Sequence, residues 1–321
     1  MTNLASIQGI EPATAVVHQH YRRLAATRRL YTVLAIGALV LTLLASLVFA
    51  NSASAGKFLD RLPYLFDFIR SFVPDDPVEI VRAMFDLPSP YADGSFKYDY
   101  EEGRHYLFGT GLYVPEYFYD MLVTLNIAFI STLIGGLFAF GLCFAAASNL
   151  GVAPPLRWII RRVLELLRAF PEIVLAGMLA AVISLGPIAA IFAVSVHTIG
   201  ALGKMFFEVV ENADMRPDDG LRSVGATWLE RVRFGMVPQV LPNFVSYFLL
   251  RTEINVRAST IIGAVGGGGI GEVFRLSISR DHAAKTYAIV ILLFLTIVAV
   301  DQLSGYLRRR LVGNAAFQFG A

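Results

Sequence analysis

The sequence has little charge and a single cysteine. Only 16% of its 321 residues are charged, against about a quarter in soluble domains, whereas 56% are hydrophobic and the mean hydropathy is +0.60. The net charge of +2 lacks the excess of basic residues that would point to nucleic acid as a partner. Cys143 lies in an apolar run without a second cysteine, so no disulfide is possible and we expect it to be buried. This composition is typical of a membrane protein.

Motifs for ATP hydrolysis and for metal binding are also missing. The phosphate-binding loop G-x-x-x-x-G-K-[ST] needs Ser or Thr after its lysine, but Phe58 and Met205 follow the two Gly-Lys pairs. The run GGGGIG at 266–271 matches G-x-G-x-x-G, yet apolar runs flank it instead of a soluble strand and helix. We interpret these glycines as points where the backbone unwinds or helices approach closely. His18 and His20 lack the spacing of a metal site. We expect no catalytic residue, cofactor or metal in this chain.

Apolar runs long enough for membrane spans, about 20 residues each, recur along the chain. Leu30–Ala50 carries no charge, and Met121–Ala147 is the second run. Residues 169–207 contain two charges and predict two spans divided by a Ser-Leu-Gly-Pro turn. A fifth run begins at Asn243, and a sixth includes Thr286–Val300. The sequence therefore predicts an all-α, polytopic helical bundle of about six transmembrane helices.

Arginines gather near the ends of these spans and predict the orientation. By the positive-inside rule, both termini and the loops after the second and fourth spans are expected in the cytoplasm. Residues 51–116, with 11 acidic and 6 basic residues, are expected outside. The arginines are Arg22, Arg23, Arg28 and Arg29 before the first span, Arg157, Arg161, Arg162 and Arg168 after the second, Arg216, Arg222, Arg231 and Arg233 after the fourth, and Arg308, Arg309 and Arg310 after the last.

These patterns divide the chain into regions. We expect a cytoplasmic N-terminal segment (1–29), a first transmembrane helix (30–50), an external insert (51–117), a core domain (118–311) containing a cytoplasmic loop (211–242), and a cytoplasmic tail (312–321). A cleaved signal peptide is the alternative for the first helix, but its apolar core is too long and its basic leader too distant. Helical spacing within the insert predicts short amphipathic helices at the outer interface. They either cover helix ends or dock another protein.

Residues 218–242, DDGLRSVGATWLERVRFGMVPQVLP, are polar and helical in pattern, although apolar runs flank them. The expected apolar stripe consists of Leu221, Val224, Trp228 and Val232. Gly225 interrupts that stripe where a sharp bend costs least. Pro238 and Pro242 are expected to end the helical pattern before the next span. Such a bent helix pair fits a groove on a soluble partner or folds back on the lipid, and the residues alone favour neither.

After its apolar start, the fifth run continues into a dense set of polar residues. Such residues are costly in a membrane unless they are partnered, and they usually face the bundle interior. The set is Arg251, Glu253, Asn255, Arg257, Ser259 and Thr260. Glu253 and Arg257 are four residues apart and can meet on one helix face, as can Arg251 and Asn255. Glu253 and Arg257 either neutralise each other and brace the bundle, or Arg257 and the neighbouring hydroxyls offer donors to a phosphonate or phosphate oxyanion.

Other polar or small residues in the spans have simpler interpretations. Glu172 suits the N-terminus of the third span, and His197 suits interior contacts. Lys204 is expected to extend toward the membrane surface, and Asp301 to pair with a basic group. Close helix packing is predicted at Gly135, Gly136, Ala139 and Gly141.

The polar stretch resembles the coupling loop of binding-protein-dependent ABC importers, written E-A-A, three residues, G, nine residues, I, one residue, L-P. Asp219-Gly220-Leu221 stands at the E-A-A positions, with Gly225 at the glycine, Gly235 at the isoleucine, Val237 at the leucine and Pro238 at the proline. The spacing is kept, but only the glycine and the proline are identical.

Three further segments resemble the permease subunit of phosphonate ABC transporters: LLRAFPEIVLA (166–176), RTEINVRASTIIGAVGGGGIGEVF (251–274) and VDQLSGYLRRRL (300–311). The resemblance covers roughly residues 120–311 and implies a type I importer permease fold, similar to that of methionine importers. It implies a bacterial cytoplasmic-membrane protein that imports phosphonate, phosphate or phosphite. The implied partners are two cytoplasmic ATPase subunits, which bind ATP and Mg, an external substrate-binding protein and a second permease copy.

The resemblance also assigns roles to residues. The coupling loop would contact the ATPase through Asp219, Gly220, Leu221, Val224, Gly225, Trp228, Val237 and Pro238. The polar set of the fifth span, from Arg251 to Thr260, supplies the candidates for the translocation path. A secondary transporter for a small anion is the alternative. It would predict internal repeats and paired broken helices, whereas the sequence has no clear repeat and one glycine-broken segment.

Overall fold

The computed structural model describes residues 10–53, 58–71, 76–87, 105–106, 111–279 and 283–312. The chain divides into two compact units, residues 1–70 and 71–321, and the boundary falls inside the predicted external insert. The helical prediction is confirmed. In the described ranges the strands are β1 (His105–Tyr106) and β2 (Tyr113–Val114), which pair antiparallel.

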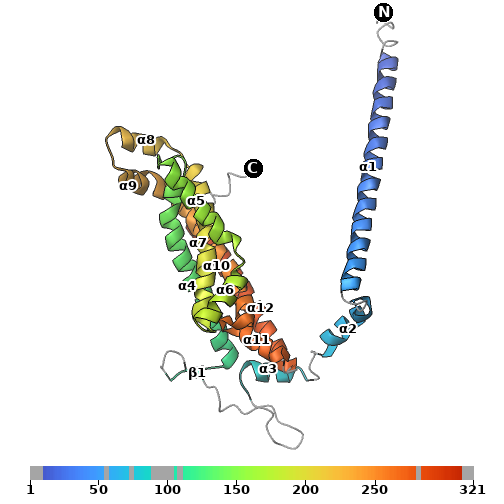
Figure 1. Cartoon of the computed structure of the whole chain (residues 1–321), viewed down its shortest axis with the longest axis vertical. Helices are drawn as coiled ribbons and strands as arrows, with labels where there is room; N and C mark the ends of the chain where they lie inside the picture. The colour runs from blue at the N-terminus through green and yellow to red at the C-terminus, as the bar shows by residue number, and fades with distance from the viewer. Residues whose placement is uncertain are drawn as a thin grey trace, which may run out of the picture. The chain divides into compact units, whose positions relative to one another are not determined.

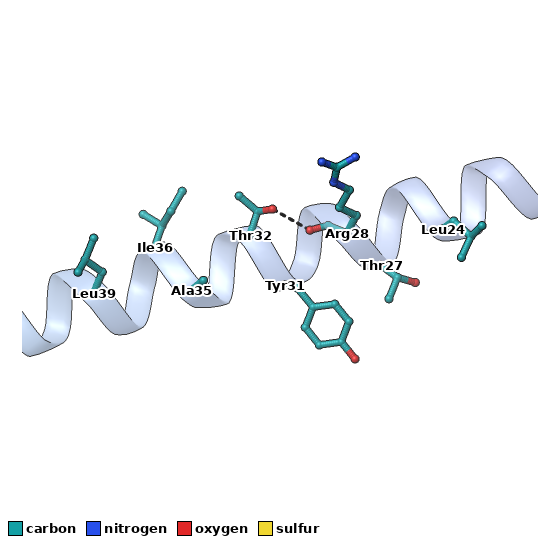
Figure 2. A pocket seen from close by; sticks show the side chains of 8 residues that line it. All are labelled: Leu24, Thr27, Arg28, Tyr31, Thr32, Ala35, Ile36 and Leu39. Carbon is teal, nitrogen blue, oxygen red and sulfur yellow. Dashed lines mark hydrogen bonds between the residues drawn. The ribbon is translucent and has the colours of Figure 1, made fainter. Parts of the chain in front are cut away.

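The first unit contains two helices, α1 (Ile10–Ala53) and α2 (Phe58–Ser71). Within α1, Thr27–Ser52 is apolar and long enough to cross a membrane, and this range includes the span predicted at 30–50. None of that apolar window is buried against other parts of the chain. Figure 2 shows a shallow hollow lined by α1 alone, where the Thr32 hydroxyl donates to the Arg28 carbonyl oxygen at 2.9 Å. This hollow is the open face of one helix.

The second unit holds the helical bundle (Figure 1). Its elements after the short helix α3 are α4 (Glu116–Ala146), α5 (Pro154–Ala169), α6 (Glu172–Val182), α7 (Pro187–Glu211), α8 (Arg216–Ser223), α9 (Trp228–Glu230), the π-helix η3 (Arg231–Met236), α10 (Val237–Ile262), the π-helix η4 (Gly263–Gly267), α11 (Ile270–Ser279) and α12 (Ala283–Val312). Helix α3 (Val78–Met84) lies in the predicted insert, so α2 and α3 confirm that the insert contains short helices.

Hydrogen bonds define the two ends of the bundle. At one end, Ser148, which follows α4, donates its backbone N–H to Glu211 at the end of α7 (2.8 Å). At the opposite end, the Thr124 hydroxyl near the start of α4 accepts the N–H of Ile270, which follows the glycine run (3.0 Å). We call these the elbow end and the glycine end. The chain therefore runs through α4 to the elbow end, and α7 runs the same way.

Four described helices are long and apolar enough to span a membrane, or five if α10 and α11, bent by 58°, form one span. The predicted third span is only the 11-residue α6, about 16 Å long at 1.5 Å per residue and too short for a hydrocarbon core of about 30 Å. Helices α5 and α6 together lead the chain back along α7 from the elbow end. Leu164 of α5 packs on Gly203 of α7, and Glu172 of α6 lies 3.4 Å from His197 of α7. Pro171 breaks the helix between them because the residue before a proline avoids helical geometry. The predicted count of six spans therefore exceeds the four or five described helices that are each long and apolar enough to cross a membrane.

Small residues bring α4 and α7 together. A Cβ at Gly135 would lie 2.6 Å from the Cβ of Thr198, and Gly136 and Ala139 are also buried, which confirms close packing there. Gly141 is exposed with nothing within 4 Å, so the prediction for it was wrong. Cys143 is fully buried, as expected. Near the elbow end, the rings of Phe206 and Phe244 stack with centroids 4.0 Å apart.

Candidate functional site: a bent helical elbow and a polar bundle core

The polar stretch forms an elbow, α8–α9–η3, that extends from the elbow end of the bundle (Figure 1). Its base is fixed by Asp218 of α8, which is 1% exposed and accepts two hydrogen bonds from the guanidinium of Arg231. Val232 and Met236 of η3 are buried in the same core as Phe244. An ion pair on one side and apolar packing on the other therefore hold the two arms of the elbow to the bundle.

Close packing at Gly235 joins the two arms. A Cβ there would lie 3.3 Å from the Leu221 side chain and 3.4 Å from the backbone N of Asp218. Leu221 is half-buried at this contact. A bulky side chain at 235 would push α8 away from η3, which explains why this chain has glycine at a position where the importer signature has isoleucine.

The bend lies at Gly225, as predicted. Its φ of +82° is in the left-handed region that glycine adopts readily, and its N–H donates to the Arg222 carbonyl oxygen, closing α8. Thr227 and Glu230 then form a capping box that starts α9. Local sequence signals thus end one arm and begin the next within a few residues.

Two expectations for the elbow were wrong. The predicted apolar stripe does not lie on one face: Val232 is buried, whereas Val224 is 80% exposed, because the bend at Gly225 separates them. Nor do the prolines end the helical pattern. Pro238 lies in the first turn of α10, directly after the π-helix η3, and Pro242 lies inside α10. The helical path instead runs from Trp228 through both prolines to the kink at Val265 and Gly266.

The outer part of the elbow exposes large apolar side chains. Leu229 is 68% exposed, Phe234 61% and Trp228 40%. Together with Val224, these four residues are named the elbow tip. Of the other predicted coupling residues, Asp219 and Gly220 are exposed on α8, Val237 is half-buried against the core, and Pro238 is exposed. The structure therefore brings the predicted loop together as a structured elbow with a buried base and an exposed apolar tip.

Five of the six polar residues of α10 fall into two sets on different faces, and Thr260 belongs to neither set. Arg251, Asn255 and Ser259, spaced by four residues, are buried at 6%, 0% and 1% exposure. Glu253 and Arg257 bond to α12 instead. The Thr260 hydroxyl donates to the Val256 carbonyl oxygen within α10 (3.1 Å). The predicted grouping of Arg257 with the Ser259 and Thr260 hydroxyls is therefore not formed.

Arg251 joins α10 to α6 and α7. Its Nη2 donates to His197 Nδ1 at 2.6 Å and lies 3.4 Å from Glu172 Oε2, and its Nε donates to the Thr198 hydroxyl at 3.3 Å. Glu172, His197 and Arg251 are named the Arg251 node. Sequence reasoning gave Glu172 and His197 separate minor roles. The available signal was that each is an ionisable residue inside an apolar run, and such residues need partners.

Asn255 binds the two threonines that the sequence analysis missed. Its Nδ2 donates to the hydroxyls of Thr132 (2.8 Å) on α4 and Thr198 (3.0 Å) on α7. Arg251 and Asn255 therefore meet at Thr198 rather than with each other. Among the described residues, Asn255 Oδ1 and Ser259 Oγ find no hydrogen-bond partner. The three helices thus meet in a polar layer within an otherwise apolar interior.

Two ion pairs link α10 to α12. Arg257 Nη2 donates to both carboxylate oxygens of Asp301 (3.0 and 3.1 Å), and Arg308 Nη2 donates to Glu253 at 2.9 Å. The predicted pairing of Glu253 with Arg257 was wrong, because each finds a partner on the neighbouring helix. Asp301 pairs with a basic group, as expected. Lys204 lies 3.5 Å from Glu208, one turn away on α7.

The Arg257–Asp301 pair is half-exposed at mid-height in the bundle. Asn255 contacts the middle of α4 and of α7, and Arg257 is two residues, about 3 Å, further along α10. Yet the Arg257 and Asp301 side chains are 48% and 41% exposed. Charged groups at this depth are costly against lipid and normally face protein or water. The side of the bundle formed by α10 and α12 is therefore unsuited to contact with lipid tails.

The fold and the elbow define a class: a polytopic helical membrane protein that presents a bent, partly apolar helix pair at one end. Residues 138–313 match the family described as binding-protein-dependent transport system inner membrane component. The chain belongs to this family.

Relatives and solved structures agree with that assignment. The chain is 37% identical over 189 residues to a phosphate-import permease protein, PhnE, of Mycolicibacterium smegmatis, covering 59% of this chain and 36% of that protein. It is 36% identical over 152 residues to a putative phosphite transport system permease protein, HtxE, of Stutzerimonas stutzeri, covering 47% of this chain and 58% of that protein. The matched region thus spans between about a third and three fifths of these relatives.

A shorter relative is matched almost completely. The putative cryptic phosphonate transport system permease protein PhnE2 of Escherichia coli is 39% identical over 120 residues, which is 37% of this chain and 98% of that protein. Among solved structures, an inward-facing conformation of the MetNI methionine ABC transporter matches with a TM-score of 0.54 and 20% identity, covering 61% of this chain and 95% of that one. This likeness confirms the predicted methionine-importer-like permease fold.

Proposed function

We propose that this chain is the membrane-spanning permease subunit of an ATP-driven ABC importer for a phosphorus oxyanion: phosphonate, phosphate or phosphite. It works with two ATPase subunits that bind ATP and Mg, an external substrate-binding protein and a second permease copy. The elbow end faces the cytoplasm together with both termini, and the glycine end faces outward. The relatives whose names carry phosphate, phosphite and phosphonate transport support this substrate class.

The elbow is the observation that carries the proposal. Its base is anchored by the Asp218–Arg231 pair and by the core around Met236, whereas its tip exposes four large apolar side chains. Because the base is anchored, a displacement of the tip would also displace α7 and α10. Exposed apolar side chains on a rigid helical support are typical of surfaces that fill a groove on another protein.

The translocation path, in this proposal, follows the side of the bundle formed by α6, α10 and α12. Arg257 and Asp301 are half-exposed there at mid-height, and Glu172 and His197 are partly exposed at the Arg251 node. A second permease copy facing this side would keep these charges away from lipid and enclose an aqueous route between the copies. The six candidate residues from Arg251 to Thr260 lie along this helix, α10.

A Gly225→Trp variant tests the coupling role. Nothing lies within 4 Å of a Cβ at Gly225, so the bundle has room for the side chain, but the φ of +82° disfavours it and the bend shifts. We expect the permease to insert normally while the ATPase no longer co-purifies and ATP-driven uptake is lost. Gly111→Trp is the matched control, since Gly111 has a φ of +74° and open space at the other end. Normal uptake by Gly225→Trp would refute the role of the elbow.

A further inference from the structure

Burial differs among the members of the Arg251 node. The Arg251 side chain is 7% exposed, whereas those of Glu172 and His197 are 25% and 22% exposed. Anything that approaches the node from its open side therefore meets the carboxylate and the imidazole before it meets the guanidinium. Glu172 is the negative charge nearest to Arg251, so it neutralises a cation that would be costly to leave unpaired inside a bundle.

The hydrogen bonds within the node leave donors free. A guanidinium only donates, so His197 Nδ1 accepts from Arg251, and the neutral ring carries its proton on Nε2. Arg251 Nη1 makes no hydrogen bond to any residue in the described ranges. Glu172 is held only at 3.4 Å, near the upper limit for a hydrogen bond. The His197 Nε2–H faces the backbone of Arg168, so the unoccupied donors of the node are the two N–H groups of Arg251 Nη1, while the carboxylate is loosely bound.

Arg257 offers a contrast. Its Nη2 is shared between both oxygens of Asp301 at 3.0 and 3.1 Å, and within the described ranges the pair has no third partner comparable to His197. A tetrahedral oxyanion arriving at Arg257 would have to compete with a carboxylate that already accepts at ordinary hydrogen-bond length. At Arg251 it would compete with a longer contact and would find the N–H groups of Nη1 unoccupied.

We propose that Glu172 is a built-in competitor at an oxyanion subsite: phosphate, phosphite or phosphonate displaces its carboxylate from Arg251 and accepts from the unoccupied N–H groups of Arg251 Nη1. This inference rests on the proposed function and adds the residues that contact the anion inside the membrane. When the anion leaves, Glu172 returns to Arg251, so the guanidinium always has a negative partner. The exchange keeps the affinity low, and a path that must release its substrate requires a low affinity.

Glu172→Gln tests the subsite. The assembled transporter, without its binding protein, is titrated with inorganic phosphate in lipid nanodiscs, and binding is followed by phosphorus NMR line broadening. Removing the competing charge should tighten phosphate binding about tenfold, the size of one charge-assisted hydrogen bond, and slow ATP-driven phosphate uptake in proteoliposomes. Arg251→Gln should abolish the binding, and Arg251→Lys, which keeps the charge, should retain part of it.

Lys204→Gln serves as the matched control, because it breaks another ion pair on α7, with Glu208, and should leave phosphate binding unchanged. Unchanged or weaker phosphate binding by Glu172→Gln, in a transporter whose wild type imports phosphate, would overturn the inference. So would an Arg251→Gln variant that melts earlier yet binds phosphate normally, since the node would then only brace the bundle. A wild type that imports none of the three anions would instead overturn the proposed function itself.

Discussion

The glycine bend of the elbow and the one at the glycine end have opposite surroundings. At the elbow, Gly220 and Gly225 have nothing within 4 Å of an added Cβ. At the glycine end, a Cβ on Gly271 would overlap the Thr260 carbonyl oxygen and lie 2.9 Å from the Ala264 N, and one on Gly267 would lie 2.7 Å from Ile262. The first bend needs glycine for backbone freedom alone, whereas the second needs it for space as well, since Gly266, Gly268 and Gly269 also have positive φ.

This difference separates two mechanical roles. The bend at the glycine end locks helices together: the Gly186 N–H donates to the Gly266 carbonyl oxygen (2.8 Å), and Thr124 accepts from Ile270. It fixes α10 to α4 and α7. The elbow keeps its surface open, and a partner can therefore reach it. A sequence motif that contains glycine does not reveal which role applies, because space and backbone freedom call for the same residue.

Gly271→Ala should have the largest effect on stability. Gly271 lies in a helix, so alanine suits its backbone, but the added methyl group collides with the backbone of α10 and η4. Overpacking of this kind costs about 3 kcal/mol, equivalent to a fall of roughly 6–12 °C in melting temperature. The measurement is thermal unfolding of the purified permease in detergent.

Gly141→Ala is the control for this change. Gly141 is also helical, but it is exposed with open space around it, so alanine should leave the melting temperature unchanged or raise it slightly. Equal melting temperatures for the two variants would show that the close contacts at the glycine end do not hold the helices.

Asp218→Asn should loosen the elbow without unfolding the bundle. Asp218 is buried and accepts two hydrogen bonds from Arg231, so loss of its charge should cost about 2 kcal/mol. Amide hydrogen exchange across α8 should then be faster by about 30-fold. Asp214→Asn is the control: its contact with the Arg216 guanidinium is 4.0 Å long and exposed, and exposed pairs contribute little. Asparagine keeps an oxygen that can accept the hydrogen bond from the Arg216 N–H. Unchanged exchange in Asp218→Asn would mean that packing at Gly235 alone fixes the elbow.

Much of this architecture could be predicted from the sequence, and the failures have a common cause. Apolar runs, the Gly225 bend and the fold class were predicted correctly because each depends on local pattern or on resemblance. The predicted pairing of Glu253 with Arg257 was wrong because the spacing argument considered α10 alone. The partners of these residues, Arg308 and Asp301, lie on α12.

The Arg251 node was missed for the same reason. Its three residues are 25 and 54 positions apart in the chain and meet only after α6, α7 and α10 have packed. The predicted third span proved to be only the short helix α6, and the residues before Pro171, predicted as a loop, form the helix α5. Contacts between helices, not propensities within them, decided each of these outcomes.

Leu229→Ser should have the smallest effect, and it should be confined to partner binding. Leu229 is 68% exposed at the elbow tip, so serine removes no interior contact and the melting temperature should not change. If the tip fills a groove on the ATPase, the loss of one apolar anchor should weaken the complex about tenfold, measured by the ATPase concentration needed to restore uptake. Leu112→Ser, at a residue 64% exposed at the glycine end, should leave that concentration unchanged. Equal behaviour of the two serine variants would mean that an open bend does not by itself make the elbow tip a binding surface.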